Sequence, residues 1–571
     1  MAAEIEEPVS AGDNSATAEE VKPYKIHVSS RYLNLTKQKL EIARLPKELD
    51  DPKSSDWWQP QSQVEPLIDY WLEQYQWREQ EEALNGLPQF RTGFTIPQSK
   101  SPIRIQFIHA LSPHPNVIPL LLIPPFPFSS LSLGHLIKLF TEPEEANHQP
   151  FHVVIPSLPG LGFSDALPAN APVISSAAGI LDSLMKRLGY ARYIASNTGP
   201  GVSSPAQIDY KLADWLSTQY PESCLGTHVI SPPLTQPRLK ETPLAWAKWS
   251  IAKFFEASIY GYRSDDFSVL RQRRVGAPKK SKIAVRFRPS KPGLTEPNTL
   301  SYALCDSPTG LLVFVMKGLC LLAPQREFTP TEIINFTQLA WLPGPESAMR
   351  FWGYCERHPE TTGKNSSRKS DVALTVFLGD AKREAPQNGN GVNGNANTDM
   401  FDGVKPSYSC PTWAKTRYNV LHTNRVSGNP SLLAWERPEI IAAGVRGLAA
   451  ALIKLNKWPQ LPTIKPETAP PPGGQEVAAG AETTAAAPPP SGEQQQQPSS
   501  PVGGSSEVSS FKSGLLAPPN IGERLSPVRE ISDETKVASH ETLPAKTPSP
   551  VPTTPSPGPP SPPAVVTTEA G

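Results

Sequence analysis

Cysteine is scarce and unpatterned in this sequence. Only five cysteines occur in 571 residues, and no two have the Cys-x-x-Cys spacing typical of metal and redox sites. An odd number of scattered cysteines argues against a disulfide framework and against a zinc site. We therefore predict reduced thiols in a cytoplasmic protein, with no metal and no cofactor.

An excess of charge and long apolar runs are also missing. Lys plus Arg and Asp plus Glu both number 54, so no overall field favours nucleic acid or an anionic membrane. No uninterrupted apolar run approaches the ~18 residues of a membrane span. Residues 1–22 lack the apolar core of a secretion signal and read as a disordered N-terminus. We predict no nucleic-acid partner, no transmembrane segment and a cytoplasmic location.

Proline, by contrast, is abundant, with 67 residues. Many prolines lie in a Pro/Ser/Thr-rich tail, residues 463–571, which has too few apolar residues to offset the entropy of ordering. We expect this tail to be disordered, and Ser-Pro pairs such as Ser549-Pro550 could attract protein partners or proline-directed kinases. A second low-complexity segment, residues 386–408, is rich in Asn-Gly. The sequence gives no indication of oligomeric state.

Between these segments, apolar runs typical of strands alternate with helical periodicity, which predicts an α/β fold with a mostly parallel, doubly wound sheet. The alternation is lost between residues 233 and 339, as an inserted lid would cause. Expected strands cover 23–28, 103–109, 120–123, 151–156, 227–232, 371–377 and 418–421, and expected helices cover 31–45, 64–75, 177–188, 215–221 and 438–455.

The segment Ala195–Gly201 has the context of a nucleophile elbow, the sharp turn that presents a catalytic side chain in α/β-hydrolases. It follows the apolar pair Tyr193-Ile194, precedes a segment that could open a helix, and has small residues on either side of its apex. The apex itself is Gly199, which has no side chain. The sequence thus predicts the scaffold of an active site without its reactive atom.

Several motifs, in order, resemble microsomal-type epoxide hydrolases. The N-terminal ones are Tyr24-Lys25-Ile26-His27-Val28, Asp69-Tyr70-Trp71, Trp77-Arg78-x-Gln80-Glu81-x-x-Leu84-Asn85, Pro88-Gln89-Phe90 and Phe107-Ile108-His109. Further matches are Ser157–Asp165, Asn298–Leu311, Trp341-Leu342-x-Gly344, Arg350-Phe351 and Leu432–Pro438. The resemblance implies an α/β-hydrolase fold with an N-terminal meander and a helical lid.

The same resemblance implies a division of the chain. Its parts are 1–22 disordered, 23–115 N-terminal meander, 116–235 first half of the core, 236–345 lid, 346–462 second half of the core, and 463–571 tail. Within the lid lies a basic loop, residues 271–282. We expect a solvated loop there, with a polyanion-binding or nuclear-import patch as the alternative.

The resemblance also implies a two-step reaction in which an elbow Asp opens the epoxide to an ester and a His then activates water. The nucleophile position falls on Gly199, and the base position falls on Ser431. Asp380 stands at the acid position, although a Gly-Asp pair is also ordinary turn chemistry. The loop that would stabilise the oxyanion is Pro124-Pro125-Phe126-Pro127, and the later lid tyrosine falls near Trp352 and Tyr354.

We therefore expect an epoxide-hydrolase-like pseudoenzyme that has lost hydrolysis and binds an apolar small molecule or a protein. The alternative is an active epoxide or ester hydrolase of xenobiotic or lipid metabolism that uses displaced residues. Thr198 and Ser203 are then candidate nucleophiles, and His422 is a candidate base, although it fits a packed histidine better. A third explanation is a wrong gene model in which the catalytic segments are misassigned.

Overall fold

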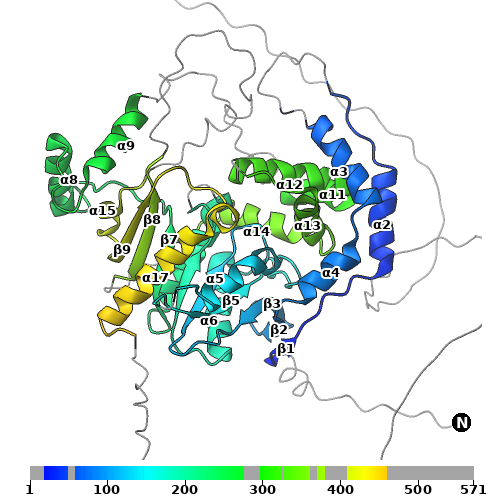
Figure 1. The fold of residues 1–571 in the computed structure, drawn as a ribbon, viewed down its shortest axis with the longest axis horizontal. Coiled ribbons are helices and arrows are strands. Elements are labelled where there is room, and N and C mark those ends of the chain that lie inside the picture. Colours follow the sequence, from blue (N-terminus) through cyan, green and yellow to red (C-terminus); the bar gives the residue numbers. More distant parts are fainter. Residues whose placement is uncertain are drawn as a thin grey trace, which may run out of the picture. The chain divides into compact units, whose positions relative to one another are not determined.

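The described part of the chain forms one mixed sheet covered by helices (Figure 1). The computed structural model describes residues 19–48, 58, 60–145, 147–201, 204–275, 296–324, 326–360, 369–379 and 408–458, all within the first of two compact units, Met1–Ala469. The described strands are β1 (Lys22–Pro23), β2 (Gln89–Phe94), β3 (Ile103–Ala110), β4 (Ile118–Ile123), β5 (Phe151–Pro156), β6 (Tyr193–Asn197), β7 (Cys224–Ile230), β8 (Asp371–Phe377) and β9 (Asn419–Val426). Their order is β1-β2-β3-β5-β4-β6-β7-β8-β9.

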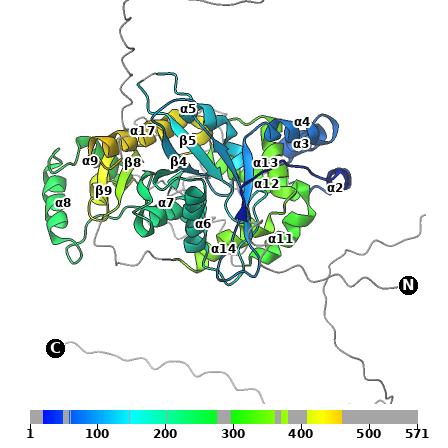
Figure 2. The same ribbon diagram turned by 90° about the horizontal axis from the view of Figure 1, so that it is seen from below.

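The sheet is parallel from β5 through β4, β6, β7 and β8 to β9, and antiparallel among β1, β2, β3 and β5. Helices α6 (Val173–Arg187) and α7 (Ile208–Gln219) cover one face (Figure 2). Helices α5 (Ile137–Thr141) and α17 (Pro438–Lys454) cover the other. This arrangement confirms the predicted mostly parallel, doubly wound sheet.

The core follows from strand alternation. All six residues of β4 are buried, because helices cover both faces of a central parallel strand. Leu121 and Ile123 pack in the cluster with α6 and α7, whereas Leu120 and Leu122 pack in the cluster with α17. Successive side chains of a strand point to opposite faces, so one strand supplies both cores.

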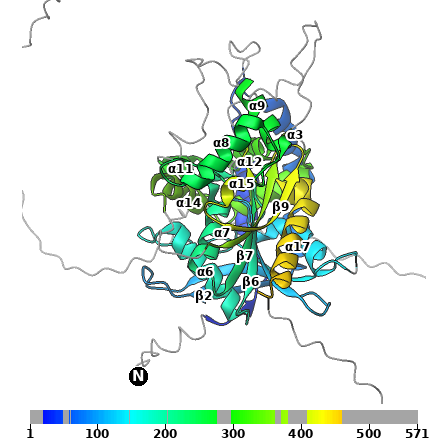
Figure 3. The same cartoon turned by 90° about the vertical axis from the view of Figure 1, so that its left-hand side faces the viewer.

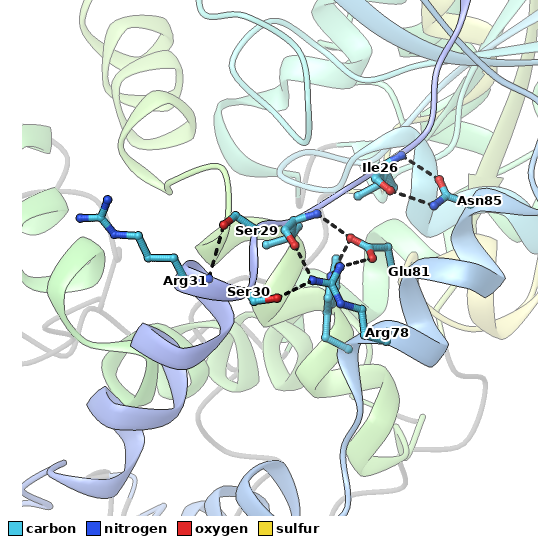
Figure 4. Close-up of polar contacts among 9 residues, drawn as sticks. Ile26, Ser29, Ser30, Arg31, Arg78, Glu81 and Asn85 are labelled. Atoms are coloured by element: carbon cyan, nitrogen blue, oxygen red, sulfur yellow. Dashed lines mark hydrogen bonds and ion pairs between the residues drawn. The ribbon is translucent and has the colours of Figure 1, made fainter. Parts of the chain in front are cut away.

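The N-terminal segment deviates from the expected strand over residues 23–28. Lys22–Pro23 pair as β1, and Tyr24 N–H still donates to Gln89 O of β2 at 2.9 Å. From Ile26 onward the backbone bonds to side chains of α4 (Trp77–Asn85) instead (Figure 4). Asn85 bonds both backbone groups of Ile26, at 2.7 and 2.9 Å. Glu81 Oε1 accepts from Val28 N–H at 2.6 Å, and Arg78 donates to Val28 O at 2.7 Å. The predicted strand was too long, because side chains, not a strand, satisfy the backbone of Ile26 and Val28.

The region between β7 and β8 contains α8 (Pro243–Phe255), α9 (Ser264–Val275), α11 (Pro297–Asp306), α12 (Pro308–Leu322), α13 (Pro330–Trp341) and α14 (Glu346–Arg357). Helices α12 and α13 pack against α2 (Ser30–Glu41) and α3 (Gln61–Glu73) through a shared apolar cluster. Helices α8 and α9 lie at the other end of the sheet, beside β9 (Figure 3). The break in alternation begins after β7 as predicted, but among the described residues it extends through α14 to β8 rather than ending at residue 339, and the lid function remains a prediction.

Four predicted features lie wholly or mainly outside the described residues. They are the N-terminus 1–22, the basic loop 271–282, the segment 386–408 and the tail 463–571. No single helix among the described residues is long and apolar enough to cross a membrane. Helices α11 and α12 reach that length and composition only as a pair bent by 117°.

Candidate active site

The expected elbow lies at the carboxyl end of β6, between β4 and β7. The amide of Asn197 accepts from Ile230 N–H at 2.9 Å. Thr198 donates to the carbonyl of Ile123 twice, from its backbone N–H at 3.1 Å and from its hydroxyl at 2.8 Å. The hydroxyl of Thr198 is therefore committed to the backbone of β4, and it is completely buried.

The apex, Gly199, has no free space above it. A Cβ placed ideally on Gly199 would lie 2.3 Å from Asp209 Oδ2 and 3.0 Å from Pro125 Cβ. Because real Cβ atoms do not approach an oxygen this closely, any side chain at this position requires a neighbour to move. The carboxylate of Asp209 thus occupies the volume into which an elbow side chain would project.

Asp209 reaches the apex because the next helix begins late. The described residues before α7 include a short 3-10 turn, Pro205–Gln207, in which Ala206 and Gln207 have positive φ angles of 48° and 56°. Helix α7 then begins at Ile208, and Asp209 lies in its first turn. The segment after the elbow does open a helix, as the sequence indicated, but this left-handed turn separates the described end of the elbow from α7.

The carboxyl of Asp209 is fully buried and only partly satisfied. Asn197 donates to Oδ2 at 3.1 Å, whereas Oδ1 has no hydrogen bond of ordinary geometry. Burial raises the pKa of Asp209, and the nearby Ser204 hydroxyl, Asn197 and backbone N–H groups of α7 only partly oppose this. The sequence interpretation missed Asp209; the one available signal was an acidic residue near the start of the helix after the elbow.

The loop after β4 closes over the apex. Pro124 and Pro125 are buried and, like Pro127, offer no backbone N–H donor. Phe126 stacks on Phe351 of α14, with ring centroids 5.7 Å apart, and meets Trp352 edge-on at 6.3 Å. The structure therefore brings this loop and α14 together above Gly199, while Pro127 is exposed.

Helix α14 contributes one unpaired donor. The indole N–H of Trp352 is buried and has no hydrogen-bond partner among the residues that the structure describes. Its neighbour Tyr354 packs on His358, with ring centroids 4.7 Å apart. A buried unpaired N–H costs free energy, so this group is a candidate contact for a ligand or a water molecule.

The ends of β8 and β9, after which the acid and base positions follow in the sequence, lie side by side. The backbones of Gly379, after β8, and Gly428, after β9, exchange hydrogen bonds of 2.9 and 3.2 Å. Ser431 is buried, and its hydroxyl donates to the carboxylate of Glu436. Asp380 and Ser203 lie outside the described residues, so their roles stay predictions.

Two histidines pack between the sheet and α17. His422 lies within β9 rather than after it, and its ring occupies the position where a side chain on Gly447 would project. His228 of β7 shares hydrogen bonds with the hydroxyls of Ser196 (2.9 Å) and Thr375 (2.8 Å). Burial lowers the pKa of His228 to about 3 and also lowers that of His422. Both rings belong to the sheet–α17 layer.

Metal binding was not expected, and no group of three or more His, Cys, Asp or Glu among the described residues is arranged to hold an ion. The described geometry therefore offers a buried carboxyl, an unpaired indole N–H and a proline-rich loop at the apex. It offers no imidazole on the residue that stands at the base position.

Comparisons with known proteins agree with this geometry. Residues 21–133 match the family model described as "Epoxide hydrolase N terminus". The chain is 23% identical to epoxide hydrolase 1 of Sus scrofa over 76% of this chain and 90% of that protein. It is 25% identical to juvenile hormone epoxide hydrolase 1 of Ctenocephalides felis, over 52% of this chain but only 59% of the flea protein.

A solved structure shows the same fold. The Aspergillus niger epoxide hydrolase superimposes with a TM-score of 0.55 at 19% identity, over 76% of this chain and 97% of that one. Together with the matched N-terminal model and the aligned relatives, these findings show that the chain has the α/β-hydrolase fold and that its sequence is similar to epoxide hydrolases over 76% of its length.

Proposed function

We propose that this chain is an epoxide-hydrolase-family pseudoenzyme that has lost hydrolysis and uses its domain to bind an apolar small molecule or a protein partner. The family reaction adds water to an epoxide, forming a vicinal diol through an ester intermediate. The observation that supports the proposal best is the Asp209 carboxylate, which fills the space above Gly199 where an elbow nucleophile would project.

Three further features support loss of this reaction. Ester formation needs a nucleophile on the elbow, and Gly199 has no side chain. Ester hydrolysis needs a base that titrates near neutral pH, and the hydroxyl of Ser431 is bonded to Glu436. An oxyanion needs preorganised donors, and Pro124 and Pro125 supply none. Losing groups that act as a unit removes both chemical steps, not one.

An active hydrolase remains the second candidate, because a carboxylate does lie at the apex. Asp209 could attack an epoxide carbon from nearly the position of an elbow Asp. Two observations weigh against this role. Burial raises the pKa of Asp209, which favours its protonated, less nucleophilic form. The other displaced candidates, Thr198 and His422, are held by Ile123 and by packing against α17.

The deciding experiment offers the purified full chain a styrene-oxide-type epoxide and an activated ester. We expect diol and acid formation no faster than in buffer. Turnover that disappears in Asp209→Asn would overturn the proposal in favour of the second candidate. A single turnover in H₂¹⁸O would then leave ¹⁸O in the peptide containing Asp209, because water attacks the ester carbonyl and leaves its oxygen on the carboxylate.

Ligand binding is measured separately, by the shift in Tm on adding the epoxide or its diol. We expect a rise in Tm with wild type and a smaller rise with Trp352→Phe, which removes the unpaired indole N–H. If no apolar probe shifts the Tm, the proposal that the domain binds an apolar small molecule is refuted and only the proposed protein interaction is left. A cytoplasmic location and partners for the tail belong to the same proposal and need independent tests.

A further inference from the structure

Helix α8 exposes a continuous apolar stripe. Leu244, Phe254 and Phe255 are 70%, 82% and 68% exposed, and Ile251 is 42% exposed. Leu244, Ile251 and Phe255 fall within about 40° of one another around the helix axis. Exposed apolar side chains gathered in this way on one element mark a surface that contacts something else.

The stripe cannot turn inward. The opposite side of α8 buries Trp249 and Ala252. The ring of Trp249 contacts Tyr262, Phe267 and Trp413, with centroids 5.2, 5.9 and 5.3 Å away. Rotating the helix would expose this aromatic cluster, so the stripe is fixed outward. Figures 1 and 2 both draw α8 at the edge of the described domain, far from α2.

The charges around the stripe are mainly positive. Glu241 and Glu256 are already paired with Arg238 and Arg271. Among the residues that the structure describes, Lys240 and Lys248 are exposed and form no ion pair. Lys248 lies about 40° from Leu244 and about 20° from Phe255 around the axis, and therefore at the edge of the stripe. The surface thus combines bulky apolar groups with uncompensated cations.

We propose that the exposed face of α8 docks on the surface of an anionic lipid membrane. Aromatic and aliphatic side chains enter the boundary between headgroups and acyl chains, and lysines beside them contact lipid phosphates and carboxylates. The balanced charge of the whole chain does not oppose this, since only charges within a Debye length of the membrane act.

The same charges argue against a second copy of the chain as occupant. A symmetric dimer through this stripe would bring Lys248 of each copy to the border of the same apolar interface. Neither cation has an acidic partner on the stripe, so the interface would desolvate like charges without compensation. An anionic membrane supplies the missing negative charge. The proposal rests on α8 alone and is independent of the proposed function.

The test is co-sedimentation of the full chain with vesicles of phosphatidylcholine alone or with 30% phosphatidylserine. We expect binding to the anionic vesicles that weakens at high salt. Phe254→Ser with Phe255→Ser should lower the partition coefficient at least about tenfold, because two apolar anchors are lost. Lys240→Glu with Lys248→Glu should remove the preference for phosphatidylserine.

A matched control removes comparable exposed apolar surface elsewhere. Tyr32 and Ile42, 57% and 77% exposed, lie on or next to α2, so Tyr32→Ser with Ile42→Ser should bind vesicles as wild type does. Unchanged circular dichroism verifies that each variant is folded. Wild type that ignores both vesicle types, or equal binding by the phenylalanine and control variants, overturns the proposal. So does a wild-type dimer that the phenylalanine variant converts to monomer.

Discussion

Gly199→Asp, the substitution that would return a nucleophile to the elbow, is expected to destabilise the protein before it restores any chemistry. The Cβ alone would lie 2.3 Å from Asp209 Oδ2 and 3.0 Å from Pro125 Cβ. Neither neighbouring side chain can move aside without breaking other contacts. Asp209 is on the first turn of α7, bonded to Asn197, and Pro125 is buried in a loop that Phe126 pins to α14.

The loss of stability expected for Gly199→Asp has a steric and an electrostatic contribution. Forcing extra atoms into a packed core costs about 1–3 kcal/mol. A second carboxyl beside a fully buried one adds more, because two carboxylates sharing a site cannot both ionise easily. We expect the free energy of unfolding to fall by at least about 3 kcal/mol at pH 7, which is the sum of a typical steric cost and the cost of one disfavoured ionisation.

The pH dependence has a defined sign. Burial raises the folded pKa of Asp209 above its unfolded value, so its stabilising contribution is present below the unfolded pKa and lost as pH rises through the folded pKa. A second carboxyl at residue 199 should steepen this loss. Gly199→Asp is therefore expected to be less destabilised at pH 4 than at pH 7.

A double-mutant cycle in urea, followed by tryptophan fluorescence, isolates the contact. Combining Gly199→Asp with Asp209→Ala should recover at least about 2 kcal/mol, since the blocking oxygen is gone. Asp214→Ala is the matched control, because Asp214 is also a buried carboxylate of α7 but pairs with Arg417 and Tyr418. A coupling below about 0.5 kcal/mol for Gly199 with Asp209, or equal coupling with Asp214, would refute the reasoning.

Three further predictions concern groups elsewhere in the described structure. Lowering the pH from 7.5 to 4 should reduce the free energy of unfolding by about 3 kcal/mol, because the pKa of His228 is lower in the folded than in the unfolded state. The stability that neutral His228 contributes is present above its unfolded pKa and is lost on acidification. In His228→Gln, the pH dependence of urea unfolding should correspond to the uptake of about one proton fewer on unfolding. Glu81→Gln should lower the free energy of unfolding by about 1.5–3 kcal/mol, because the carboxylate accepts hydrogen bonds from Val28, Trp77 and Arg78. The control Glu82→Gln, at an exposed position, should change it by less than about 0.5 kcal/mol in the same assay. Trp352→Phe should leave the free energy of unfolding within about 1 kcal/mol of wild type, because the indole N–H bonds to none of the described residues and its removal offsets part of the packing lost with the smaller ring; a larger loss would refute this offset.

The strands could be predicted because burial leaves a pattern in the residues themselves. The expected strand 371–377 coincides with β8, and 151–156 coincides with β5. The strand predicted for residues 23–28 was too long for the opposite reason. The hydrogen-bond partners of Ile26 and Val28 are the side chains of Asn85 and Glu81, which are far away in the sequence. A period-two pattern records which face is buried, but not which atoms satisfy the backbone.

The position of the Asp209 carboxylate at the elbow could not be predicted from such a pattern. Its role depends on where α7 begins, and that depends on positive φ angles at Ala206 and Gln207, residues with no intrinsic preference for them. The exposed stripe of α8 was likewise hidden, because Leu244, Ile251 and Phe255 repeat at helical spacing just as core residues do. Periodicity gives a helix face, and only the tertiary structure tells whether that face is covered.

The motifs that carry the family resemblance explain why a fold can persist while its chemistry changes. Within Trp77-Arg78-x-Gln80-Glu81, the carboxylate of Glu81 accepts hydrogen bonds from the backbone of Val28 and from the side chains of Trp77 and Arg78. Gln80 accepts from Asn335 of α13 at 2.9 Å, which ties this helix to the region between β7 and β8. Each polar identity satisfies a structural partner, and none reaches the elbow. Selection on stability alone can therefore retain such a motif, so its presence predicts the scaffold and leaves the activity to be decided at Gly199 and Asp209.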